Sequence, residues 1–375
     1  MTALRLLGLL AATVLLCASF PAGASGGVTI MAQNAPAAAA SAARGLSLAN
    51  VDPTCKPCAD FARYAMGGWQ ANNPIPPSES RWSMLDQLRE SNLLQLREIL
   101  EGVQREPWPH GSAAQKAGDY YASCTNVRER DAAGTAPIAV YLTGIREIRD
   151  LADLRLETAV LQNLGGHAFF FAGSEGDPRD EQRTIAVIVQ GGLGLPDREF
   201  YFASDARAAQ IRELYAAHVA RYFALAGDDA ASAAAAARQV LTVENALARV
   251  SRTRAERRDR LANYHKLSLA ETQALIPSWD LTTFFRDRMA PRVDVVDVEQ
   301  PDYLRGVEYV LRTSPLADLR AYLRYHLLER AAPVLSFPFA EEAAAFDAAL
   351  TGRREPSPLW RRCVKAVDTD LGDAL

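Results

Sequence analysis

The most constraining feature of this sequence is the stretch over residues 52–100, where three kinds of pattern follow one another. An opening rich in aromatic residues and glycine precedes a proline-punctuated turn, which leads into a segment with helical periodicity. In that last segment, apolar residues recur at three- and eight-residue steps on one side of a helix: Leu85, Leu88, Leu96 and Ile99. Ser78 or Ser80 could cap the first turn. The stretch therefore predicts a long helix with one apolar side.

Length and composition indicate a large globular chain. The sequence has 375 residues, of which 49% are hydrophobic, enough for one large or two ordinary domains with sizeable cores. Acidic and basic residues are interspersed and the net charge is -4. No charge field therefore favours nucleic acid or an anionic membrane. The charged run at 252–260 lacks interleaved aromatic residues, and we interpret it as a solvated helix face with internal ion pairs.

Residues 1–24 have the pattern of a secretory signal peptide. Arg5 precedes an apolar run over residues 6–20, and the small-residue sequence Ala22-Gly23-Ala24 follows. The run is shorter than the roughly 20 residues that span a bilayer, so cleavage is favoured over a permanent anchor. Residues 25–50 are rich in Ala, Gly and Ser and predict a flexible tether. We therefore expect a secreted or periplasmic protein with no membrane contact after cleavage.

Helical patterns dominate the rest of the chain, bounded by Gly, Pro, Asp or Ser. The main candidates from position 205 onward are 207–225, 228–249, 268–275, 301–312 and 315–331. The β signal comes from two short apolar runs, 168–172 and 184–189, with a turn-rich stretch at 173–178 between them. Together these patterns predict a mainly α-helical, multi-helix fold with a small β-hairpin or sheet element.

The opening block resembles the start of peptidase family M13, the neprilysin-type zinc metallopeptidases. That family begins with D-P-x-x-x-P-C-x-D-F-x-x-Y-x-x-G-x-W, followed by I-P and by S-R-W or S-R-Y before a long helix. The matching residues here are Asp52, Pro53, Pro57, Cys58, Asp60, Phe61, Tyr64, Gly67, Trp69, Ile75, Pro76, Ser80, Arg81 and Trp82.

The resemblance continues to the end of the chain. The family's G-L-G-L-P-D-R, E-x-x-L-A, Q-P-x-Y and W-x-x-C-V elements are matched at residues 192–198, 244–248, 300–303 and 360–364. It implies the helical N-terminal cap of this family over residues 51–375. It also implies that residues 51–77 pack toward a catalytic domain.

The resemblance implies zinc-dependent hydrolysis of short peptides by the intact enzyme. Two histidines of an H-E-x-x-H motif and a downstream glutamate hold Zn²⁺, and the glutamate within the motif acts as base. No histidine of this chain is followed by glutamate: His110, His167, His218, His265 and His326. The family's zinc site follows its W-x-x-C helix. We therefore expect the chain to end before the catalytic domain and to hold no catalytic residue or metal ligand.

Arg81 and Asp86 are the substrate-binding candidates that the resemblance implies. In the family, the arginine of S-R-W/Y binds the C-terminal carboxylate of a bound peptide, and the aspartate five residues later holds that arginine. A guanidinium matches a carboxylate with two parallel hydrogen bonds, which makes the role chemically reasonable. Without the resemblance, an ordinary ion pair at the start of a helix is the simpler interpretation.

The cysteines predict a disulfide-containing protein. Cys17 lies in the predicted signal, and the other four cysteines permit three pairings. The resemblance implies a bond between Cys124 and Cys363. For Cys55 and Cys58, we favour a local bridge over a metal site, which would need two more ligands, and over a redox-active pair, which lacks a βαβ context.

Three functions stay open at this point. The first is the N-terminal, non-catalytic part of a neprilysin-like metalloendopeptidase, a fragment or truncated product. The second is a stand-alone binding or scaffold protein derived from the M13 cap. The third is one chain of a split peptidase, whose partner carries the catalytic domain. We expect the chain alone to be inactive as a peptidase and to expose apolar surface meant for an absent partner.

Overall fold

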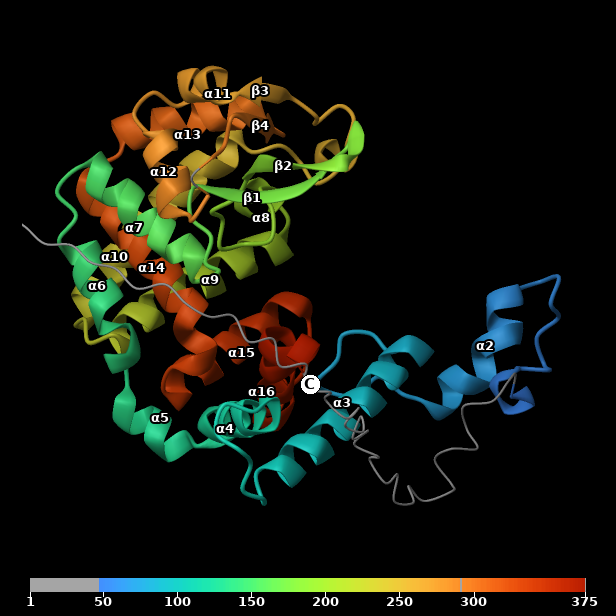
Figure 1. Cartoon of the computed structure of the whole chain (residues 1–375). Helices are drawn as coiled ribbons and strands as arrows, with labels where there is room; N and C mark the ends of the chain where they lie inside the picture. Colours follow the sequence, from blue (N-terminus) through green and yellow to red (C-terminus); the bar gives the residue numbers. More distant parts are fainter. Residues whose placement is uncertain (1–46, 291, 375) are drawn as a thin grey trace, which may run out of the picture. The chain divides into compact units, whose positions relative to one another are not determined.

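The computed structural model describes residues 47–290 and 292–374 (Figure 1). The predicted signal peptide and most of the predicted tether lie outside these residues. The chain divides into two compact units, with the boundary between Asn73 and Pro74, close to the end of the 51–77 segment. Over the described ranges, no helix combines the length and apolar character needed to cross a membrane.

The first unit contains a short 3-10 helix, η1 (Leu48–Asn50), and α2 (Phe61–Asn72). Asp60 caps α2, because its carboxylate accepts a hydrogen bond at 2.9 Å from the amide of the third helical residue. Gly68 lies against η1, where a Cβ would collide with the carbonyl oxygen of Ala49. The Gly-Gly-Trp sequence therefore permits close packing of the two helices in this unit.

Cys55 and Cys58 are free in the structure, in place of the local bridge favoured from the sequence. The thiol of Cys55 lies 3.8 Å from the carbonyl oxygen of Lys56 and 3.6 Å from that of Asp60. It therefore donates to the backbone of its own turn. Cys58 is exposed.

The second unit is mainly helical, as predicted. Its helices are α3 (Met84–Val103), α4 (Ala113–Thr125), α5 (Val127–Ala133), η2 (Ala136–Ile138), α6 (Ala139–Arg146), α7 (Leu151–Asn163), α8 (Glu199–Phe202), α9 (Ala206–Leu225), α10 (Ala230–Val250), η3 (Glu256–Arg258), α11 (Leu269–Leu275), α12 (Leu281–Asp287), α13 (Pro301–Thr313), α14 (Leu316–Ala331), η4 (Ala332–Val334), α15 (Phe337–Thr351), α16 (Leu359–Leu371) and η5 (Gly372–Ala374). The five helices expected from position 205 onward are confirmed as α9, α10, α11, α13 and α14.

The charged run at 252–260 differs from its interpretation as a helix face. It forms turns around η3, and Arg254 pairs outward with Asp197 at 2.7 Å. Thr253 binds Glu256 through its amide and its hydroxyl, both at 2.7 Å. These local side-chain bonds compete with helical backbone bonds, which explains the short 3-10 turn.

A mixed sheet lies beside α11 and α13 (Figure 1). Its strands are β1 (Phe170–Asp177), β2 (Asp180–Gln190), β3 (Lys266–Ser268) and β4 (Val295–Val298), in the order β1-β2-β4-β3. The hairpin β1–β2 and the pair β3–β4 are antiparallel, whereas β2 and β4 are parallel. The predicted hairpin is therefore confirmed, but β1 extends through most of the stretch expected to be a turn.

The main core of the second unit is built around aromatic side chains. We call the cluster of Phe169, Phe170, Trp279, Phe284 and Tyr322 the aromatic core, and all five residues are buried. Phe169 has a φ of 56°, an uncommon conformation for a bulky residue. Its N–H donates to the Tyr322 hydroxyl at 2.8 Å. This bond helps to hold the residue that leads into β1.

One buried carboxylate joins several segments of this core. Glu244 on α10 is fully buried and accepts hydrogen bonds from the hydroxyls of Tyr201 and Tyr215 at 2.9 and 2.8 Å. It also accepts the N–H of Gly194 at 3.2 Å, and His326 Nε2 lies 3.4 Å away. Glu244 thus fixes the G-L-G-L-P loop to α9, α10 and α14.

A smaller core lies between α3, α4 and α16, which we call the three-helix cluster. Its buried residues are Leu93, Leu100, Ala117, Tyr121, Cys124, Cys363, Val364 and Val367. The bond between Cys124 and Cys363, implied by the resemblance, is present and joins α4 to α16. The cluster therefore combines a modest apolar core with a covalent link.

Candidate functional site

The segment that carries Arg81 leads directly into α3. The helix is capped by Ser83, and not by Ser78 or Ser80 as expected from the sequence. The Ser83 hydroxyl accepts the Asp86 N–H at 3.3 Å and donates to the Asp86 carboxylate at 2.6 Å. Asp86 is therefore fixed at the first turn of α3, where a negative charge is favourable.

Asp86 interacts with two arginines in different ways. The hydrogen bond from Ser83 lowers the pKa of Asp86, and the charges of Arg81 and Arg89 lower that pKa further. Arg89 forms the ion pair, at 3.1 Å. Arg81 is exposed, and no ion pair of Arg81 within 4.0 Å is present among the described residues. The structure thus places Arg81 near Asp86 without joining them directly, and their substrate-binding role stays a prediction.

A buried arginine that the sequence did not single out anchors this segment. Arg361 on α16 is 7% exposed and pairs with Glu79 at 2.5 Å and with Glu90 on α3 at 2.6 Å. Arg361 therefore fixes to α16 both the segment that precedes α3 and α3 itself. The available signal was its position within the L-W-R-R-C-V element, two residues before the disulfide-bonded Cys363.

Of the four residues expected on the apolar side of α3, Leu96 packs against the three-helix cluster, but the other three do not. Leu93 and Leu100 are buried against α4 and α16, whereas Leu85, Leu88 and Ile99 are 65%, 57% and 54% exposed. The helix is apolar on both sides, and only one side has a partner in the described part of the chain. An exposed apolar strip therefore begins beside Arg81.

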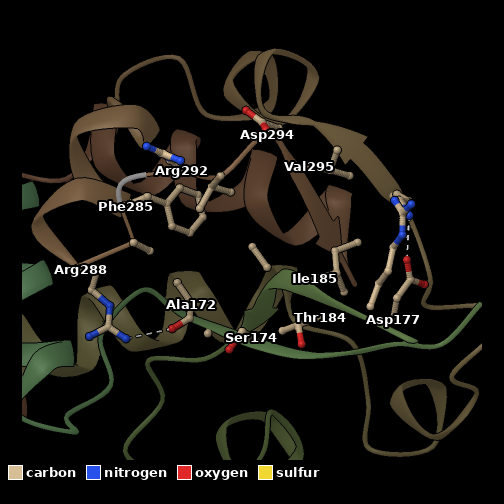
Figure 2. A pocket seen from close by; sticks show the side chains of 16 residues that line it. Ala172, Ser174, Asp177, Thr184, Ile185, Phe285, Arg288, Arg292, Asp294 and Val295 are labelled. Carbon is tan, nitrogen blue, oxygen red and sulfur yellow. Dashed lines mark hydrogen bonds and ion pairs between the residues drawn. The ribbon is translucent and has the colours of Figure 1, made fainter. Parts of the chain in front are cut away.

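A second candidate site lies at the open end of the sheet (Figure 2). A pocket of about 560 Å³ forms between the β1–β2 hairpin and the segment after α12. Arg288 lines one part of it and donates to Asn163 Oδ1 at 2.6 Å and to the Ala172 carbonyl oxygen at 3.0 Å. No sequence pattern indicated this pocket, because its walls come from segments that are distant along the chain.

Lys266 and Asp177 form an ion pair elsewhere on the pocket wall, at 2.7 Å (Figure 2). The Lys266 hydrogen bond, together with bonds from the Arg179 amide and the Tyr264 hydroxyl, lowers the pKa of Asp177 to about 2. Asp177 is therefore ionised at neutral pH and holds Lys266 in place. These bonds fix β3 to the end of the hairpin.

The described residues do not fit a zinc site of the M13 type. His218 Nδ1 lies 2.9 Å from Glu342, and its ring stacks on Phe346. Burial would lower the pKa of His326, but the carboxylates of Glu244 and Glu329 outweigh burial and raise that pKa to about 9. A protonated imidazole cannot bind zinc. Within residues 47–290 and 292–374, no group of three or more His, Cys, Asp or Glu could hold a metal ion.

Comparison with known proteins identifies curated relatives that are endothelin-converting enzymes. The chain is 29% identical over 372 residues to endothelin-converting enzyme-like 1 of Mus musculus, covering 94% of this chain and 47% of the relative. It is 27% identical over 340 residues to endothelin-converting enzyme 1 of Homo sapiens, covering 88% of this chain and 44% of the relative. The chain thus spans about half the length of the curated relatives it matches.

Solved structures agree with this relationship. The zinc metalloprotease Zmp1 of Mycobacterium tuberculosis, in complex with an inhibitor, is 26% identical and has a TM-score of 0.82, covering 88% of this chain and 50% of that one. PepO from Lactobacillus rhamnosis shares the fold, with 19% identity and a TM-score of 0.72 over 85% of this chain and 50% of that one. The sequence model of peptidase family M13 matches residues 57–375. Because that match extends over most of the sequence, this chain belongs to peptidase family M13.

Proposed function

We propose that this chain is the N-terminal cap region of a neprilysin-like zinc metalloendopeptidase that cleaves short peptides. In this proposal, Zn²⁺ and the catalytic residues come from a catalytic domain, on the same polypeptide or on a separate one. Arg81 binds the C-terminal carboxylate of the peptide substrate, and the chain alone has no peptidase activity. The observation that carries the proposal is an exposed arginine on a rigid segment beside an uncovered apolar helix face.

The geometry around Arg81 suits a carboxylate ligand. The Arg361 ion pairs with Glu79 and Glu90 limit the movement of the segment that carries Arg81. Asp86 is engaged by Ser83 and Arg89, which leaves the Arg81 guanidinium open to an external carboxylate. A single exposed ion pair contributes only about 0–1 kcal/mol. Arg81 therefore needs a second surface that excludes water before it can select a substrate.

The exposed strip of α3 supports a catalytic domain as that second surface. Met84, Leu85, Leu88 and Ile99 are between 47% and 65% exposed and lie on α3, which begins three residues after Arg81. A domain that covered this strip would bury apolar area and would also remove water from Arg81. We also propose that residues 51–77 contact the same catalytic domain. We further propose that the protein is secreted into the periplasm or the medium.

Reconstitution tests this function. The full chain is mixed or co-expressed with an M13 catalytic domain that carries H-E-x-x-H, and zinc-dependent cleavage of short peptides is measured. The Arg81→Ala variant should raise KM about tenfold for a peptide with a free C-terminal carboxylate, and should leave cleavage of the amidated peptide unchanged. Arg105→Ala, at an exposed position just after the other end of α3, is the matched control and should have little effect on either substrate.

Two results would contradict the proposal. The first is zinc-dependent turnover by the chain alone. The second is an equal rise in KM for free and amidated peptides in Arg81→Ala, which would show that Arg81 does not bind the C-terminal carboxylate. Peptide binding by the chain without any gain in turnover on reconstitution would instead support the stand-alone binding protein.

A further inference from the structure

We propose that the pocket at the open end of the sheet binds an extended acidic peptide, whose backbone pairs with β2 at Thr184 and whose carboxylate is held by Arg292. The proposal does not depend on peptidase activity or on Arg81. Three independent observations support it: an unpaired stretch of β2, an excess of cationic side chains, and a pocket whose size suits a short peptide.

The first observation is the incomplete pairing of β2. This strand runs Asp180–Gln190, but its parallel partner β4 pairs only with Ala186, Val187 and Ile188. The Glu299 N–H donates to the Ile188 carbonyl oxygen at 3.0 Å, so the backbone groups of Ile188 face β4. Backbone direction alternates along a strand, so those of Ala186 and Thr184 face the same side.

Thr184 is the first of these positions beyond the end of the parallel pairing. Its backbone N–H and carbonyl lie on the pocket side, and no strand of the described chain pairs with them there. Two residues earlier, the Gln182 N–H already donates to Asp180 Oδ1 at 3.3 Å. An incoming extended segment can therefore add to the sheet at Thr184, as peptides do at open strand edges.

The second observation is the charge of the pocket wall. Four cations and two acids line it: Arg183, Lys266, Arg288, Arg292, Asp177 and Asp294. Lys266 is neutralised by Asp177, and Arg183 pairs with Asp180 at 3.2 Å. The Nε atom of Arg288 is buried and has no hydrogen-bond partner. Arg292 is exposed on the opposite wall (Figure 2). After Asp294 is counted, Arg288 and Arg292 leave the wall with a net positive charge. Arg288 already donates to Asn163 and Ala172, so Arg292 is the side chain that can bind an anionic group.

The third observation is the size and shape of the pocket. Its volume of about 560 Å³ is within the range of small-ligand sites and can hold a few residues of peptide. Small and apolar side chains alternate with the polar ones on its walls, among them Ala172, Ile185, Phe285, Val293 and Val295. A simple inorganic anion would leave this apolar surface uncovered. A peptide with valine or threonine side chains would cover it.

Fluorescence anisotropy tests the proposal with the full chain. The probe is a short labelled peptide of alternating valine and threonine that ends in glutamate. Versions with an amidated C-terminus, and with glutamine in place of glutamate, separate a terminal carboxylate from a side-chain carboxylate. We expect saturable binding that requires at least one carboxylate. Arg292→Ala should weaken it about tenfold, whereas Arg286→Ala on α12 and Arg81→Ala should leave it unchanged.

N-methylated probes test the backbone pairing without changing the protein. Methyl groups on one alternating set of peptide amides should abolish binding, whereas methyl groups on the other set should be tolerated, because only one set faces β2. Equal binding of both methylated probes would overturn strand addition. The absence of saturable binding, or equal losses in Arg286→Ala and Arg292→Ala, would overturn the site itself. Displacement of the probe by inorganic phosphate at comparable concentration would show that the pocket binds simple anions, and would contradict the proposal that it binds a peptide.

Discussion

The aromatic core and the three-helix cluster reach stability by different means. The aromatic core surrounds Phe169 and Trp279 with further rings, and its buried carboxylate Glu244 binds three hydrogen-bond donors. The three-helix cluster has few buried residues and depends on the Cys124–Cys363 bond and on the ion pairs of Arg361. The difference indicates that the aromatic core needs no further partner for its stability, whereas the three-helix cluster keeps one side of α3 exposed.

The largest effect is expected in the aromatic core. Glu244→Gln would replace one of the two carboxylate oxygens that accept from Tyr201, Tyr215 and Gly194 by an NH2 group, which would face a donor. It would also leave protonated His326 without its closest carboxylate. Breaking a buried charge pair of this kind costs about 4 kcal/mol. Urea unfolding, monitored by circular dichroism, measures the loss. The exposed Glu213→Gln on the neighbouring helix α9 is the control, and equal stability of the two variants would refute the role of Glu244.

Removal of the disulfide should have a smaller and more local effect. The bond joins residues 239 positions apart, so it restricts the unfolded chain strongly, and replacing Cys124 and Cys363 by serine should cost about 3 kcal/mol. Hydrogen exchange should rise in α3, α4 and α16 while the helices around Glu244 stay protected. Uniform loss of protection would show that the two regions unfold together and would remove the contrast between them.

The pH dependence of stability should come mainly from the aromatic core. The pKa of His326 is about 9 in the folded chain, above the ordinary value of 6.5. Its contribution is therefore complete below pH 6.5 and is lost as the pH rises through 9, by about 3 kcal/mol. Unfolding free energies measured from pH 6 to pH 9.5 should decline for the parent protein and stay nearly flat for His326→Gln. A parallel decline in both would contradict this assignment.

Sequence patterns predicted the elements well but not their partners. The helices α9, α10, α11, α13 and α14 were predicted because apolar spacing and bounding residues are local features of the sequence. By contrast, α3 is apolar on two sides, so periodicity could not decide between Leu88 and Leu93 as the buried face. The pocket is lined by both Thr184 and Arg292, and a pocket formed by residues so far apart in the sequence cannot be predicted from local patterns. Arg361 was hidden for the same reason, since its two glutamates lie far away in the sequence.

The smallest expected effect concerns the uncovered side of α3. Leu88 is 57% exposed, so Leu88→Gln should change the free energy of unfolding by less than about 0.5 kcal/mol. Leu93 lies on the same helix but is only 8% exposed, and Leu93→Ala should cost about 3 kcal/mol. If Leu88→Gln leaves stability unchanged but weakens association with a catalytic domain, the strip acts in binding alone. A large loss of stability would instead show that the strip is already covered within this chain.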